Sequence, residues 1–361
     1  MSEAGGGSDR LVTRRGYLDW LRGVAVLVMI EAHVIDSWTR VSDRQSLVFF
    51  WSVILGGFGA PLFLFLAGVA IPLSAGSKFR RSGDARAATR AVVRRGLEIF
   101  GLAFLFRVQA WLISWGAAWT LLKVDILNIM GPSIAAAAAC WGVARTNAGR
   151  LALFAALTIA MGFLTPIVRS LPGLAALPDP LEAYIRPIPA LSNFVFMPWA
   201  GFVFAGAFIG VCLDAAQTSS VERRLNQRLF IAGALIALTA YALSFRPTLY
   251  AHSDFWTSSP AYFFLRVGIM SAAIAFAYWW EVRPRRTDGW SPLRQLGRTS
   301  LFIYWIHVEM VYGLISLPLH KGLSLTQAWI ALVALCLLML GCSVLKDRVV
   351  ERYRLRSLRT G

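Results

Sequence analysis

Charged residues are scarce in this sequence. Asp, Glu, Lys and Arg make up 15% of its 361 residues, whereas a soluble domain carries about a quarter. Hydrophobic residues, at 57%, fall in runs of about twenty, the length that a helix needs to cross about 30 Å of hydrocarbon. This composition excludes an ordinary soluble globular protein. It predicts an all-α, polytopic integral membrane protein.

Cysteines and the common metal or nucleotide motifs are also sparse. All four cysteines lie inside apolar runs, which predicts no disulfide and no metal site. The sequence contains no P-loop, no dinucleotide fingerprint and no HExxH motif. Their absence argues against an ATP-driven pump and a zinc protease, and we expect no metal cofactor.

Acidic residues are outnumbered by basic ones, 19 against 36, for a net charge of +17. In a soluble protein this excess would suggest a nucleic-acid partner. Here the basic residues lie in short segments between apolar runs, so membrane topology explains them first. We therefore expect the lipid bilayer as a partner and no nucleic acid.

The Lys and Arg residues also predict how the chain crosses the membrane. On alternate sides of the predicted spans they divide 27 to seven, and Arg107 and Arg266 lie inside spans. The positive-inside rule puts the richer side, with both termini, in the cytoplasm of a multi-pass protein of the cell (inner) membrane. About ten spans are predicted, at residues 17–38, 47–74, 96–116, 124–143, 151–168, 193–213, 229–245, 260–281, 299–318 and 325–345.

Three segments are predicted from this pattern. Residues 1–14 form a disordered cytoplasmic tail, because the segment is rich in Gly and Ser. Residues 15–346 form one transmembrane domain, and residues 347–361 a basic cytoplasmic C-terminal tail.

The first span carries a polar stripe. At about 100° per residue, Arg22, His33 and Asp36 share one face, and Glu31 points the other way. Arg22 lies near the inner interface, and His33 lies about 16 Å further along the helix. Asp36, one turn beyond, is placed to accept the Nδ1–H of His33 and fix its tautomer. The alternative is a set of polar residues that pair structurally with neighbouring spans.

Other polar residues lie at membrane depth, namely Arg107, Asp125, Arg266 and His307. Each is either a structural partner or part of an oxyanion or substrate site. The segment 78–95 carries seven positive charges, among them Arg90, Arg94 and Arg95. It serves membrane topology alone, or it binds phosphate groups.

Several motifs resemble those of a known family. The segment Leu18-Asp-Trp-Leu-Arg-Gly23, leading to His33, resembles the transmembrane acyltransferase superfamily. Together with four further segments, it looks like the heparan-α-glucosaminide N-acetyltransferase-like branch. These segments are Pro61–Gly68, Val124–Gly131, Pro198–Phe202 and Leu296–His307.

This resemblance implies an enzyme that uses acetyl-CoA, or another acyl-CoA, from the cytoplasm as co-substrate. The acceptor would be an amine or hydroxyl of a glycan or glycolipid on the far side. His33 would be the catalytic base, oriented by Asp36, and Arg22, Arg90, Arg94 and Arg95 would bind the CoA moiety. Arg107 or Arg266 would stabilise the oxyanion.

Two alternatives to an enzyme are a transporter and a membrane scaffold. A secondary transporter of acidic solutes would use the buried charges and the weak repeat between Pro61–Gly68 and Pro198–Gly206. A non-catalytic membrane scaffold would leave the buried ionisable residues without a role.

Overall fold

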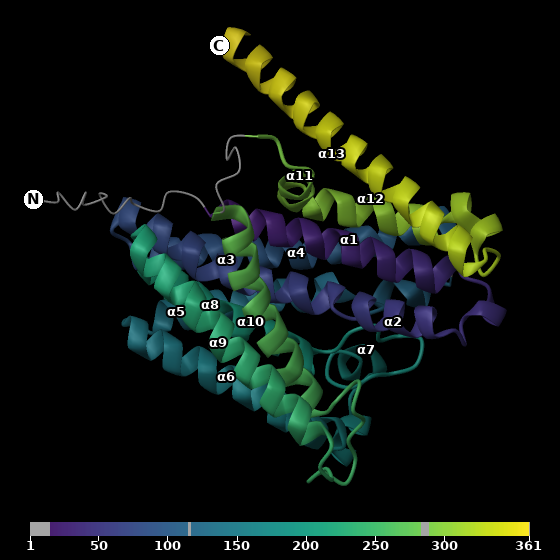
Figure 1. Cartoon of the computed structure of the whole chain (residues 1–361), viewed down its shortest axis with the longest axis horizontal. Helices are drawn as coiled ribbons and strands as arrows, with labels where there is room; N and C mark the ends of the chain where they lie inside the picture. The colour runs from purple at the N-terminus through teal and green to yellow at the C-terminus, as the bar shows by residue number, and fades with distance from the viewer. Residues whose placement is uncertain (1–14, 115–116, 283–288, 361) are drawn as a thin grey trace, which may run out of the picture. The chain divides into compact units, whose positions relative to one another are not determined.

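The computed structural model describes residues 15–114, 117–282 and 289–360, shown in Figure 1. It is 81% helix, and no strand occurs among the described residues, which confirms the predicted all-α class. The principal helices are α1 (Gly16–Trp38), α2 (Leu47–Gly56), α3 (Gly59–Ser82), α4 (Ala85–Ser114), α5 (Ile126–Val143), α6 (Asn147–Arg169), α7 (Asp179–Glu182), α8 (Phe196–Ala215), α9 (Ser219–Ser244), α10 (Pro260–Val282), α11 (Pro292–Arg298), α12 (Ser300–Tyr312) and α13 (Leu325–Thr360). Within the described residues, four short 3₁₀ turns lie between them at Val41–Asp43, Ala118–Leu122, Pro172–Ala176 and Leu314–Leu319.

Eight helical stretches in the described residues are long and apolar enough to cross a membrane. They correspond to eight of the predicted spans. The other two predicted spans are α1 and α12. Four charged residues, Asp19, Arg22, Glu31 and Asp36, interrupt α1, and α12 has only 13 residues. The count of ten spans and their orientation therefore stay predictions.

The predicted tail 1–14 lies outside the described residues. At the other end α13 continues as one helix to Thr360, so residues 347–360 of the predicted basic tail extend the last apolar helix.

The chain divides into two compact units. Unit 1 comprises Leu64–Ala103 and Lys123–Trp280, with Arg15; unit 2 comprises Gly16–Phe63, Phe104–Leu122 and Glu281–Gly361. Unit 1 thus holds most of α3 and α4 and the helices α5–α10. Unit 2 holds α1, α2 and α11–α13.

Unit 1 is built on close approaches between glycines and neighbouring backbones. A Cβ placed on Gly68 of α3 would lie 2.0 Å from the carbonyl oxygen of Val203, and one on Gly206 of α8 would lie 1.9 Å from that of Phe65. The two segments of the weak sequence repeat therefore pack against each other. Without a hydrophobic force between helices in lipid, small residues allow the close packing that holds them together.

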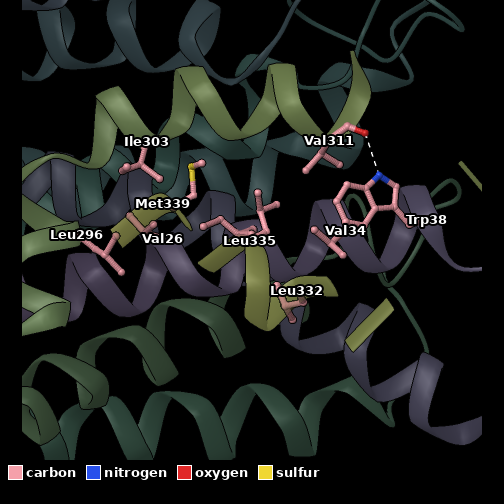
Figure 2. Close-up of a cluster of buried hydrophobic side chains, with 10 residues drawn as sticks. Val26, Val34, Trp38, Leu296, Ile303, Val311, Leu332, Leu335 and Met339 are labelled. Atoms are coloured by element: carbon pink, nitrogen blue, oxygen red, sulfur yellow. Dashed lines mark hydrogen bonds between the residues drawn. The ribbon is translucent and has the colours of Figure 1, made fainter. Parts of the chain in front are cut away.

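Unit 2 is organised around α1, which contacts α2, α11, α12 and α13. A continuous buried cluster joins α1, α11, α12 and α13, and Figure 2 shows its side chains meeting between the ribbons. Its members are Val26, Ile30, Val34 and Trp38 of α1, Leu296, Ile303 and Val311 of α11 and α12, and Leu332, Leu335 and Met339 of α13.

A hydrogen bond from Trp38 also holds the end of α12 to α1. The Trp38 indole N–H donates to the carbonyl of Val311 at 3.1 Å, the dashed line in Figure 2. Ser316 Oγ donates to the same oxygen at 2.7 Å. This carbonyl lies in the last turn of the helix, where the helix itself supplies no partner. The bond from Trp38 fixes the register of α12 along α1, and the bond from Ser316 closes the end of α12 locally.

Candidate active site

The packing of unit 2 brings two histidines together. His307 lies on α12 midway between Ile303 and Val311, so it shares their face toward the cluster. His33 lies on α1 beside Val34 of the same cluster. The two residues are 274 positions apart in sequence, and only the pairing of α1 with α12 makes them neighbours.

The contact between the imidazoles is close. His33 Nδ1 and His307 Nε2 lie 2.9 Å apart, and the rings are nearly parallel, with an interplanar angle of 7°. The other nitrogen of His307, Nδ1, lies 2.8 Å from the backbone oxygen of Ile303. His307 is completely buried, whereas His33 is partly exposed. Tyr312 approaches His33 edge-on, with ring centroids 5.4 Å apart.

Asp36 forms an ion pair with Arg44 and does not contact His33, the partner that its helical spacing predicts. Its carboxylate pairs with Arg44, at 3.4 Å, and its side chain is 65% exposed. Asp36 is near the end of α1, where the chain turns into the segment that carries Arg44. The predicted contact of Asp36 with His33 is therefore wrong, because Asp36 pairs with Arg44 and the side chain at His33 Nδ1 is His307.

The motif around Arg22 has a structural basis. Arg22 donates to Asp19 one turn earlier at 3.2 Å. The next residue, Gly23, faces α11, where a Cβ on it would lie 2.0 Å from the carbonyl oxygen of Leu293. Reciprocally, a Cβ on Gly297 would lie 1.9 Å from the carbonyl oxygen of Asp19. Two motifs from opposite ends of the chain thus make one helix crossing.

Arg107 lies in unit 2, on the last part of α4. Glu309 of the same unit is two residues beyond His307 on α12. Residues two apart on a helix point in roughly opposite directions. The oxyanion role of Arg107 stays a prediction.

Glu31 of α1 lies outside the polar stripe that the sequence predicts for this helix. It points away from the His33 face, as predicted, yet it is only 4% exposed. Within the described residues neither carboxylate oxygen has a hydrogen-bond partner. Gly56 of α2 makes room for it, because a Cβ there would lie 3.0 Å from Glu31 Oε2.

Two other predicted site residues belong to unit 1. Arg266 of α10 stacks on Tyr262, with its guanidinium carbon 3.8 Å from the ring centroid, and donates to the hydroxyl of the same tyrosine. Asp125 is the N-cap of α5 in a capping box with Asn128. Both residues therefore have evident local structural roles.

The basic segment forms the end of α3 and the start of α4 in unit 1. Arg80 pairs with Asp214 at 2.9 Å. Arg94 and Arg95 share the carboxylate of Glu98, yet their side chains are 83% and 55% exposed. Arg90 is exposed as well. One carboxylate shared by two arginines leaves this face of α4 positively charged and open to an anion.

Asp84 begins α4 at the tip of this segment. Its carboxylate accepts hydrogen bonds from the backbone N–H groups of Ala87, at 3.0 Å, and Arg86, at 2.8 Å. Both bonds favour the charged form. The backbone bond from Ala87, followed by that from Arg86 and the nearby charges of Arg90 and Arg86, holds the pKa of Asp84 below its usual value.

Sequence reasoning identified His33 and His307 separately but missed their pairing. The available signals were that both are histidines at membrane depth and that both close a motif. Neither signal gives the distance between two spans. Asp36 was preferred as a partner because local helical spacing can be read from sequence.

Comparison with known proteins agrees with the motifs. Residues 14–245 match the family model for heparan-alpha-glucosaminide N-acetyltransferase, catalytic. The matched region covers well over half of the chain and includes Arg22 and His33. It ends before α10, so Arg266 and His307 lie beyond it. No curated protein matches the chain.

Proposed function

The chain belongs to the heparan-alpha-glucosaminide N-acetyltransferase family, and we propose that it moves an acetyl group from cytoplasmic acetyl-CoA to a glycan across the membrane. Family membership implies a membrane acetyltransferase. The donor, the acceptor and the direction of transfer are the proposal. The acceptor is an amine or a hydroxyl of a glycan or glycolipid on the extracytoplasmic side.

The observation that carries this proposal is the histidine pair. His33 lies eleven residues after Arg22 in the motif segment, within the matched region, and contacts a fully buried His307. A partly exposed imidazole with a fixed neighbour is the arrangement that a general base needs. If the pair served only to hold α1 against α12, the partly exposed residue at position 33 would not need to be a histidine.

The reaction balances with His33 as the only proton carrier. His33 takes the proton of the acceptor O–H or N–H while the acceptor attacks the thioester carbonyl carbon. The C–S bond then breaks, and the leaving thiolate of CoA takes the proton back from His33. The products are the acetylated glycan and free CoA, and His33 returns to its neutral form.

The remaining predicted residues take supporting roles in the proposal. Arg90, Arg94 and Arg95 bind the phosphates of CoA on the exposed face of α4, since guanidinium groups match phosphate geometry. Arg22 contacts the CoA moiety, and Arg107 supplies positive charge for the oxyanion.

Membrane vesicles of defined orientation test donor, direction and base together. Inverted vesicles expose the cytoplasmic face, so they should transfer label from externally added acetyl-CoA to enclosed glycan acceptors, whereas right-side-out vesicles should not. His33→Ala should lower the rate by roughly 10²–10⁴-fold. His252→Ala, in an exposed segment of unit 1, should leave it unchanged. Transfer by His33→Ala at the parent rate would contradict the assignment of the base.

A secondary transporter of acidic solutes remains the second candidate, favoured by one observation. Glu31 is a buried carboxyl group without a hydrogen-bond partner in the described residues, and such groups serve as proton carriers in transporters. A transporter would move solute without consuming acetyl-CoA. Solute uptake that survives His33→Ala and fails in Glu31→Gln would favour this candidate.

A further inference from the structure

We propose that His307 is a positioning residue that fixes the tautomer of His33, so that the Nε2 atom of His33 is the base. This inference rests on the proposed function for its chemical consequence. Its structural content, the position of two protons, does not depend on any activity.

The protons follow from one backbone atom. The carbonyl oxygen of Ile303 can only accept a hydrogen bond. His307 Nδ1, 2.8 Å from that oxygen, therefore carries a proton. In a neutral imidazole one nitrogen donates and the other accepts, so Nε2 of the buried His307 has a lone pair. That lone pair faces His33 Nδ1 at 2.9 Å.

A lone pair on His307 requires a donor opposite it. His33 Nδ1 must therefore carry its proton, and in neutral His33 the unprotonated atom is Nε2. The sequence of bonds runs from His33 Nδ1–H to His307 Nε2, and from His307 Nδ1–H to the Ile303 carbonyl. Because the Ile303 carbonyl oxygen can only accept, the direction of donation in both hydrogen bonds is fixed. The arrangement therefore locks the tautomer of His33.

The fold holds this arrangement in place. Ile303 and Val311, one helical turn on either side of His307, belong to the buried cluster with Val34 and Trp38 of α1. The bond from Trp38 to the Val311 carbonyl fixes the register of the two helices. His307 is 0% exposed, so no water competes for its nitrogens. A charge on this buried ring would have no water to stabilise it. The acceptor that orients His33 is therefore a neutral imidazole.

This assignment separates His307 from Asp36. The Asp36 carboxylate pairs with Arg44 and its side chain is 65% exposed. Asp36→Asn should therefore keep acetyl transfer near the parent rate. His307→Leu should lower kcat by about tenfold, the scale of one lost hydrogen bond, with the KM for acetyl-CoA little changed. His307→Gln keeps an acceptor of similar reach and should recover most of the rate.

Nitrogen NMR tests the proton positions directly. The chain has only four histidines, so the full-length protein with ¹⁵N-labelled histidine gives four ring-nitrogen pairs. His252→Ala and His320→Ala identify two of them. We expect both His33 and His307 of the parent protein to show protonated Nδ1 and unprotonated Nε2 at a pH where the rings are neutral. In His307→Leu, His33 should lose this preference, and in His307→Gln it should keep it.

The outcomes distinguish this inference from the proposed function. A parent protein in which neutral His33 carries its proton on Nε2 overturns the tautomer lock, whatever its activity. So does a His307→Leu protein in which His33 keeps the Nδ1–H form. The expected proton positions in a protein that fails to transfer acetyl groups support the lock and overturn the proposed function.

Discussion

Gly23 lies where α1 crosses α11, and its replacement by alanine has a magnitude that follows from the structure. The added Cβ would lie 2.0 Å from the carbonyl oxygen of Leu293, 2.6 Å from its carbonyl carbon and 2.9 Å from its Cα. Cβ atoms do not approach other heavy atoms within 3.0 Å. Since all three neighbours are backbone atoms, α11 as a whole must retreat by about 1 Å, and no side-chain rotation relieves the contact.

Forced expansion of a packed interface typically costs about 1–3 kcal/mol. Alanine in a helix gains about 0.5–1 kcal/mol over glycine, which offsets part of this. Because the contact is with rigid backbone, the upper end of this cost applies, and we expect Gly23→Ala to lower the free energy of unfolding by about 2 kcal/mol net. The matched control is Gly341→Ala on α13 of the same unit, where a Cβ meets nothing within 4 Å. That substitution should raise the free energy of unfolding.

Both variants can be unfolded from mild detergent by increasing SDS and followed by tryptophan fluorescence. Gly23→Ala should unfold at a lower SDS fraction than the parent, and Gly341→Ala at the same or a higher fraction. If the two variants unfold together, the close crossing of α1 and α11 is wrong. The glycine in the Leu-Arg-Gly23 motif would then need a reason other than packing.

Two further outcomes are expected. Glu31→Gln should keep acetyl transfer near the parent rate, measured in the vesicle assay, because Glu31 lies on the opposite side of α1 from His33; loss of transfer would place Glu31 in the mechanism. The stabilising effect of Asp84, whose pKa is lowered by its backbone hydrogen bonds, should be fully present above its unfolded pKa of about 3.9. The difference between the SDS fractions at which the parent and Asp84→Ala unfold should therefore stay constant from about pH 8 to 5 and shrink as the pH falls toward about 3. A difference that instead grows with acidity would show that the carboxylate is not the stabilising form.

The sequence by itself determined the class of the protein. Runs of apolar residues dictate helices, since a chain in lipid must satisfy its backbone hydrogen bonds within each segment. The motif around Arg22 and Gly23, taken together with four further segments, indicated the family. Each of these properties depends on residues within one or two helical turns.

Tertiary structure alone decided which distant residues meet. Helical spacing favoured Asp36 as the partner of His33, because three positions along a helix are predictable. The contact with His307 depends on the rotation and register of α12 against α1, which the buried cluster and the Trp38 hydrogen bond set. The same holds for Gly23 and Gly297, whose backbones approach only because α11 lies across α1. Side-chain packing between helices has no fixed period in sequence, and for that reason the site had to be read from the structure.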